Sequence, residues 1–123
     1  MRDDKENIIV VKTVDFSIAV IDYCELLESD KKYIVARQLL RAATSIGANV
    51  FEAQNAESTV DFIHKMKVAA KEASETQYWL ILCEKSKSYR FEINLKNQIV
   101  EIIKILSKII SSSKGGLDDP PGS

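Results

Sequence analysis

The sequence predicts an all-α protein, a bundle of four helices around one hydrophobic core. The chain has 123 residues, a length typical of a single domain. Hydrophobic residues make up 46% of the chain and charged residues 28%, which is the balance of a globular protein rather than a disordered one. Four segments repeat their apolar residues at spacings of three and four, and none shows the alternation that marks a strand.

The first expected helix spans residues 7–27 and has two apolar stripes. One stripe, at positions i, i+4, i+7 and i+11, should pack into the core; it consists of Phe16, Val20, Tyr23 and Leu27. The second stripe lies roughly opposite and consists of Val14, Ile18 and Ile21. Because the second stripe faces away from the core, we expect it to be a contact surface between subunits.

The second expected helix spans residues 33–53, after a polar break. Its buried side should contain Leu39, Ala43, Ile46 and Val50. At about 100° per residue, six polar side chains fall within a third of the opposite side. They are Arg37, Gln38, Arg41, Ser45, Asn49 and Glu52. Gly47 lies inside this helix and costs about 1 kcal/mol relative to alanine, so we expect close packing beside it or, alternatively, a kink.

The third expected helix begins at a capping box of Ser58 and Asp61. Steps of four and three then predict a seam between helices, formed by Phe62, Met66, Ala69, Ala73, Thr76, Leu80 and Cys83. A stripe of aromatic, aliphatic and charged residues should face away from the core and contact other subunits. It consists of Val68, Lys71, Glu72, Glu75, Tyr78, Trp79 and Leu82.

The fourth expected helix spans residues 91–111 and is the most regular amphipathic helix of the four. Its apolar face contains Phe91, Leu95, Ile99, Ile102, Leu106 and Ile109. Glycine and proline follow, so we expect the bundle to span residues 1–113 and residues 114–123 to form a flexible tail.

Charge and cysteine content restrict the classes of function. The net charge is -1, so any nucleic-acid binding requires a local basic patch. Cys24 and Cys83 lie in apolar helical patterns without C-x-x-C spacing, which indicates buried thiols. No apolar run approaches the length of a membrane span, and we expect a cytoplasmic protein that does not enter a membrane.

Residue patterns of catalytic or metal chemistry are missing from the sequence. His64 is the single histidine and lacks ligand spacing. Glu72 and Glu75 are three residues apart, but a di-iron site needs Glu-x-x-His motifs and further carboxylates. We therefore expect no catalytic residue, metal or cofactor, and we expect the two glutamates to form salt bridges with Lys71.

The polar side of the second helix has two interpretations. Arg37 and Arg41 lie one helical turn apart, and guanidinium groups suit bidentate contacts with phosphate. Alternatively, the polar side chains pair with one another across an interface between helices or subunits, since buried polar groups normally find partners. The first interpretation predicts an RNA or partner site, and the second predicts a structural contact.

Two segments resemble one protein family. Residues 38–53, QLLRAATSIGANVFEA, are similar to a signature segment of the 23S rRNA intervening sequence proteins. A second segment is similar downstream, through Ser58, Asp61, Phe62, Lys65, Ala69, Lys71, Glu72, Ala73, Glu75, Thr76, Tyr78, Trp79 and Leu80. The family often ends the first segment with Asn-x-Ala-Glu-Gly, whereas this chain has Asn49-Val50-Phe51-Glu52-Ala53.

The resemblance implies an up-and-down antiparallel four-helix bundle that assembles into a homopentameric ring and has no known enzymatic activity. A related branch includes the accessory variability protein of diversity-generating retroelements, which binds reverse transcriptase and nucleic acid. Two functions follow as expectations. One is an oligomeric scaffold that binds RNA, a ribonucleoprotein or reverse transcriptase, and the other is a purely structural protein–protein interaction module.

Overall fold

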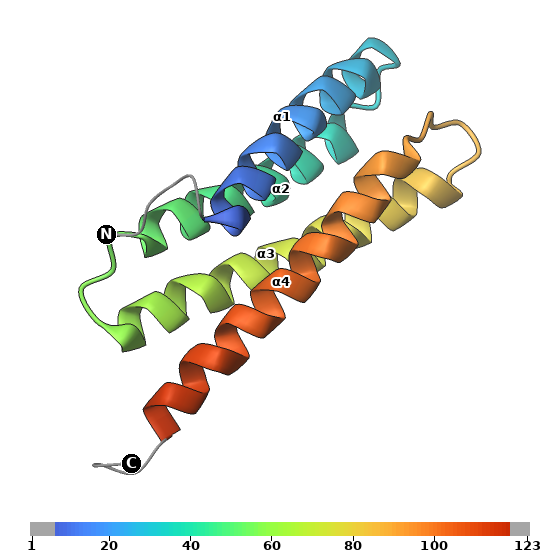
Figure 1. Cartoon of the computed structure of the whole chain (residues 1–123). Coiled ribbons are helices and arrows are strands. Elements are labelled where there is room, and N and C mark those ends of the chain that lie inside the picture. The colour runs from blue at the N-terminus through green and yellow to red at the C-terminus, as the bar shows by residue number, and fades with distance from the viewer. Residues whose placement is uncertain (1–6, 119–123) are drawn as a thin grey trace.

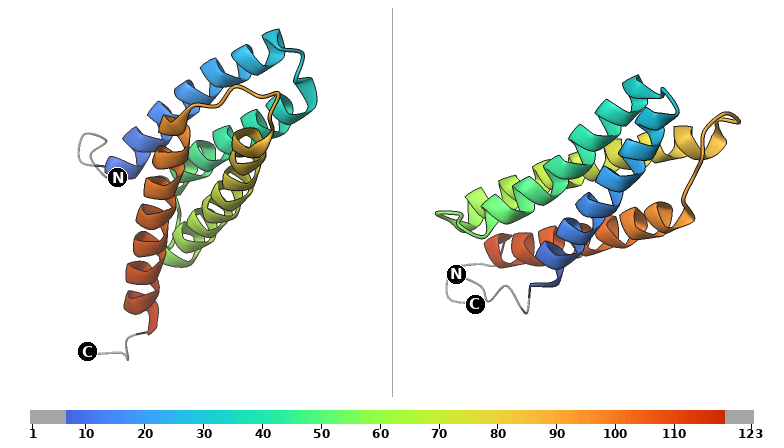
Figure 2. Two further views of the ribbon diagram at one scale, coloured as in Figure 1. Left: turned by 90° about the vertical axis from the view of Figure 1, so that its right-hand side faces the viewer. Right: turned by 90° about the horizontal axis from the view of Figure 1, so that it is seen from above.

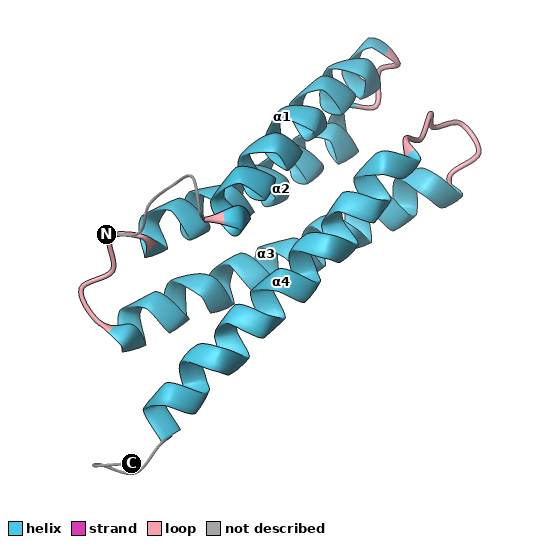
Figure 3. Cartoon of the chain, viewed as in Figure 1, coloured by secondary structure: helices cyan, strands magenta, loops and turns pink. Residues whose placement is uncertain are grey.

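The computed structural model of the chain describes residues 7–118 and confirms the expected fold class. It contains four α-helices, and no strand occurs in the described range (Figure 3). They are α1 (Ile8–Ser29), α2 (Tyr33–Ala53), α3 (Thr59–Lys85) and α4 (Ile93–Asp118). The sequence placed α2 at its observed bounds and the starts of the other three within two residues.

The helices run alternately up and down (Figure 1). The α1–α2 and α3–α4 loops lie at one end, and the α2–α3 loop lies at the other. Each helix packs on its neighbour in sequence, α2 on α3 most extensively, while α1 and α4 share a smaller contact. Figure 2 shows that α1 and α4 diverge along their length. Among the described residues, no such packing contact joins α1 to α3, so these two helices lie diagonally across the bundle.

The core contains the apolar residues that the helical spacing selected. On α1 and α2 every expected core residue is buried, including Phe16, Tyr23 and Ile46. On α3 six of the seven expected seam residues are buried; Phe62 is half-buried, and the adjacent Ile63 is buried instead. Small side chains on α2 and α3 belong to the core as well, and Ala43 and Ala69 are fully buried. Alanine at such positions allows helix backbones to approach closely.

Gly47 lies where α2 approaches α1. A Cβ atom at this position would lie 3.5 Å from Ser17 Oγ and 3.5 Å from Thr13 Cβ. That separation is ordinary van der Waals contact. Gly47 is therefore packed against α1, which agrees with the expectation of close packing beside it.

The start of α3 confirms the predicted cap. The Ser58 hydroxyl accepts a hydrogen bond of 3.0 Å from the Asp61 N–H. The Asp61 carboxylate accepts one of 3.3 Å from the Glu57 N–H, so a carboxylate also lies at the positive end of the helix dipole. The first bond pairs an N–H group of the first helical turn that would otherwise lack an intrahelical partner, whereas the second is donated by the residue before the Ser58 cap rather than by Ser58 itself.

The end of α4 differs from the sequence prediction. The helix was expected to end near Ser111, before a flexible tail from Lys114, but it continues through Gly115 to Asp118. A glycine in a helix costs about 1 kcal/mol, which weakens a helix without stopping it. A proline does stop it, and the first proline of the chain is Pro120. The remainder of the expected tail, residues 119–123, lies outside the described residues.

Polar contacts connect the two loops at the end where α1 and α3 terminate. Arg90 Nη2 donates a hydrogen bond of 2.8 Å to Asp30 Oδ1, and Lys32 Nζ donates one of 3.3 Å to Ser88 Oγ. The hydroxyl of the buried Tyr23 donates to the carbonyl oxygen of Arg90. These bonds join the α1–α2 connection to the α3–α4 connection, which are about 60 residues apart in the sequence.

Lys31 terminates α1 in a left-handed conformation with a φ of 65°. The Lys31 N–H donates to the Glu28 carbonyl at 2.9 Å, and the Lys32 N–H donates to the Leu27 carbonyl at 2.8 Å. This pair of bonds is the Schellman motif, which usually has glycine at the left-handed position.

We predict that Lys31→Gly stabilises the protein by about 1 kcal/mol, because glycine adopts this conformation without a clash at Cβ. Urea unfolding of the variant and the wild type, at one protein concentration, measures the difference. Lys31→Ala is the matched control, since it removes the same side chain and keeps Cβ. A gain of equal size in both variants would mean that backbone strain at residue 31 is not its source.

Candidate functional site

The α2 polar face comprises the six residues expected to lie opposite the core: Arg37, Gln38, Arg41, Ser45, Asn49 and Glu52. The structure leaves Arg37, Gln38, Arg41 and Glu52 exposed and Ser45 and Asn49 half-buried. Asn49 Nδ2 donates to the Ser45 carbonyl at 2.9 Å, so part of the face is bonded within the helix. The face has both signs of charge and is not a uniform basic patch.

Arg41 joins the α2 polar face to α3. Its Nη1 lies 3.0 Å from Glu72 Oε2, and its Nη2 forms an ion pair with Glu75 Oε2. The sequence predicted Lys71 as the partner of these glutamates, and the structure places Arg41 there instead. Lys71 is exposed on the outside of α3, whereas Glu72 and Glu75 are half-buried beside α2.

Trp79 completes this cluster. Its indole Nε1 donates a hydrogen bond of 3.0 Å to Glu75 Oε2. That bond and the contact with Arg41 lower the pKa of Glu75, because both favour the ionised carboxylate. The hydrogen bond to Glu75 likewise raises the pKa of Arg41. Glu75 is therefore held as an anion that fixes an arginine and a tryptophan.

The outer stripe expected on α1 is present. Val14, Ile18 and Ile21 are 47%, 54% and 40% exposed, and Val11, at 47%, extends the stripe by one turn. These large aliphatic side chains are in contact with water along half of the 22-residue helix.

The outer stripe expected on α3 is only partly turned outward. Tyr78 is 55% exposed, and Lys71 is exposed as well. Trp79 instead packs against the core, while its ring meets that of Tyr78 edge to face with centroids 5.5 Å apart. Val68 and Leu82 are half-buried. The prediction that Trp79 faces away from the core was wrong, because Trp79 lies one helical turn after Glu75, on the side of α3 that faces α2.

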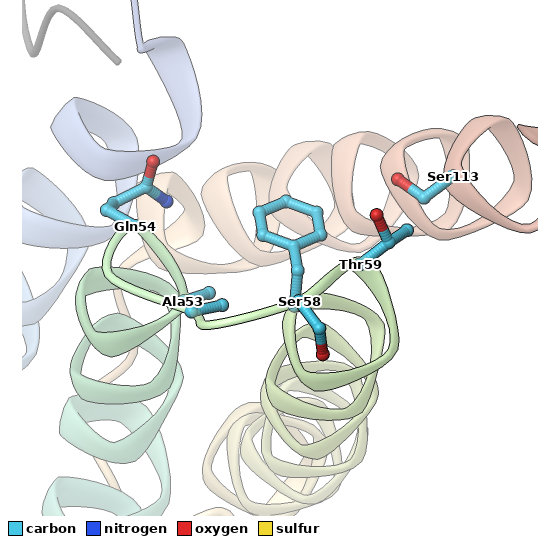
Figure 4. A pocket seen from close by; sticks show the side chains of 7 residues that line it. Ala53, Gln54, Ser58, Thr59 and Ser113 are labelled. Atoms are coloured by element: carbon cyan, nitrogen blue, oxygen red, sulfur yellow. The ribbon is translucent and has the colours of Figure 1, made fainter. Parts of the chain in front are cut away.

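A hollow of about 520 Å³ lies at the α2–α3 loop, a feature that the helical pattern did not indicate (Figure 4). Its lining comes from the end of α2, from the α2–α3 loop, from the start of α3, and from Ser113 of α4. The lining residues are Ala53, Gln54, Ala56, Ser58, Thr59, Phe62 and Ser113. The Ser58 hydroxyl caps α3, and the Gln54 side chain bonds Asn7 and the Val50 carbonyl. The polar groups of the lining are hydroxyls and one amide, none of which ionises near neutral pH.

Both cysteines are free and buried, as the sequence predicted. Burial raises the pKa of the Cys24 thiol to about 12, and it also raises the pKa of Cys83. Tyr23 lies beside them, and burial raises its pKa in turn. Between residues 7 and 118, the structure contains no group of three His, Cys, Asp or Glu side chains placed to hold a metal ion.

These features define a class of protein, an all-α four-helix bundle whose outer surfaces mix aliphatic and charged side chains. The chain belongs to the 23S rRNA-intervening sequence protein family, whose model matches residues 5–108. The resemblance found in the sequence is therefore confirmed.

A crystal structure of a related protein supports the assignment. It is a protein of unknown function from the S23 ribosomal protein family of Bacteroides thetaiotaomicron, 37% identical, with a TM-score of 0.78. The match covers 83% of this chain and 97% of that chain. No curated protein matches this chain. None of the helices between residues 7 and 118 has the length and apolar character that crossing a membrane requires.

Proposed function

We propose that the protein is a non-catalytic cytoplasmic module that works by assembling with copies of itself, as a homopentameric ring. The observation that carries the proposal is the row of exposed aliphatic side chains on α1, formed by Val11, Val14, Ile18 and Ile21. An aliphatic stripe of this length on a small domain typically marks a protein contact. The five-fold ring is the assembly that the family resemblance implies.

The mass of the protein in solution tests this proposal. Light scattering coupled to size exclusion should give a mass that is a multiple of 13.8 kDa, five-fold for the proposed ring. The measurement is made over a hundredfold range of protein concentration, because a weak assembly dissociates on dilution. A mass of 13.8 kDa at every concentration would contradict the proposal.

A second candidate is a scaffold that contacts RNA, a ribonucleoprotein or reverse transcriptase through the α2 polar face. Arg37 and Gln38 favour it, because both are exposed at one end of that face. The pairing of Arg41 with Glu72 and Glu75 weighs against it, since the guanidinium already has two anionic partners. Binding of RNA that falls steeply with salt and is lost in Arg37→Glu, with the oligomer intact, would establish this second candidate.

A further inference from the structure

Exposed charges are segregated between the two diagonal helices, α1 and α3. We define the α1 outer face as the exposed residues between positions 11 and 25: Val11, Val14, Asp15, Ile18, Ile21, Asp22 and Glu25. Its charged members are all acidic. Lys12 is half-buried and forms an ion pair with Glu101 of α4, so it does not offset them.

The α3 outer face has the opposite character. It comprises the exposed residues between positions 60 and 85: Val60, His64, Lys67, Lys71, Ser74, Tyr78, Ile81 and Lys85. Three of them are lysines and none is acidic. The acids of α3 are half-buried and bonded elsewhere: Glu72 and Glu75 to Arg41, Glu84 to Lys96, and Asp61 to the Glu57 N–H. The lysines of this face thus lack an acidic partner on their own helix surface.

Like charges also meet at one end of the α3 outer face. Lys114 of α4 lies beside Lys67, and their repulsion lowers the pKa of Lys67. An acidic surface docked on α3 would relieve this repulsion. Both outer faces also combine charge with exposed apolar side chains, Tyr78 and Ile81 on α3 matching Ile18 and Ile21 on α1.

We propose that the α1 outer face of one subunit docks on the α3 outer face of the next, so that a second copy of this chain is the partner of both faces. The inference rests on the proposed self-assembly and specifies its geometry. The contact is heterologous, because each face meets a different face. Since α1 and α3 are diagonal, one subunit engages two neighbours at once, an arrangement that builds a ring when the rotation from each subunit to the next closes. A two-fold contact of α1 with α1 would instead bring Asp15, Asp22 and Glu25 against their own copies.

Two variants, each blocking one face, test the geometry. Val14→Lys with Ile18→Lys blocks the α1 outer face, and Tyr78→Glu with Ile81→Glu blocks the α3 outer face. All four positions are exposed, and lysine and glutamate are good helix formers, so the bundle itself should fold. Far-ultraviolet circular dichroism checks the helix content. Ile34→Lys, at a 77% exposed position of α2 outside both faces, is the control and should assemble as the wild type does.

Each variant alone should have the monomer mass, and an equimolar mixture should form a complex that contains both. The intact α3 face of one variant can then bind the intact α1 face of the other. If either variant assembles alone, or if the mixture stays monomeric while the wild type is oligomeric, the heterologous contact is wrong and the proposed self-assembly still stands. A monomeric wild type would overturn both. If both variants assemble normally but the α3 variant loses RNA binding, the α3 outer face is a nucleic-acid surface instead.

Charge reversal provides an independent test should a blocking variant misfold. Lys67→Glu with Lys71→Glu should raise the concentration for half-assembly at least about tenfold, because acids then face acids across the contact. Adding Asp15→Lys and Asp22→Lys to the same chain should restore assembly to within about threefold of the wild type. If the variant with all four substitutions does not recover assembly, the pairing of these two faces is overturned.

Discussion

Phe16→Ala should lower the free energy of unfolding by about 3–5 kcal/mol, the usual loss for removing a buried phenylalanine ring. Phe16 lies on α1 with none of its surface exposed, and the core cluster around it draws residues from all four helices. The ring leaves a cavity that the backbone cannot fully close. Since domains of this size have a total stability of about 5–15 kcal/mol, the variant should be close to unfolding.

Phe51→Ala is the matched control, because it makes the same change at a position of α2 that is 58% exposed. Its effect should stay within about 0.5 kcal/mol. Urea midpoints are compared at one protein concentration, since assembly adds to apparent stability. Similar losses in the two variants would contradict the placement of Phe16 in the core.

The protein should lose stability steeply above pH 9. Burial raises the pKa of Cys24 from 9.0 to about 12 in the folded state and raises the pKa values of Cys83 and Tyr23 as well. Between pH 9 and 12 the unfolded chain releases the Cys24 proton and the folded chain keeps it. The free energy of unfolding therefore falls with rising pH, by about 1.4 kcal/mol per pH unit for Cys24. Cys83 adds to the loss in the same direction above pH 9, and Tyr23 does so above pH 10. Below pH 9 both states hold the proton, and this contribution is constant.

Urea unfolding in reducing buffer at pH 7, 9, 10 and 11 measures the effect. Cys24→Ala combined with Cys83→Ala serves as the comparison, because it removes two of the titrating groups. The double variant should be less stable at pH 7 and should have a shallower dependence on pH above 9. Parallel curves for the two proteins would show that the thiols do not cause the alkaline loss.

The core could be predicted from the sequence because the residues on the buried side of a helix recur at steps of three and four. Leu39, Ala43, Ile46 and Val50 repeat at steps of three and four, and all four are buried. The cap of α3 was predictable for a similar reason, because Ser58 and Asp61 act within one turn of the chain. Capping chemistry within one turn and helical periodicity were sufficient to predict these features.

Contacts between helices were less predictable, because they depend on which helices are neighbours and how they are rotated. The period placed Glu72 and Glu75 on one side of α3, but it could not show that Arg41 of α2 faces that side. The contact between Tyr23 and Arg90 joins residues that are 67 positions apart, and no local pattern predicts a contact over that separation. The left-handed conformation of Lys31 was not predictable either, since a left-handed residue that is not glycine has no distinctive sequence.

The separation of charge between α1 and α3 also places an acidic surface and a basic surface on opposite sides of the bundle. The net charge is only -1, so these local surfaces, rather than an excess of one sign over the whole chain, set the sign of the field close to each of the two helices. If copies associate through these two faces as proposed, the opposite charges turn approaching copies toward each other before they touch, which accelerates productive encounters. Salt at physiological concentration confines this field to about 8 Å, so orientation acts over the last few ångströms of approach and weakens as ionic strength rises.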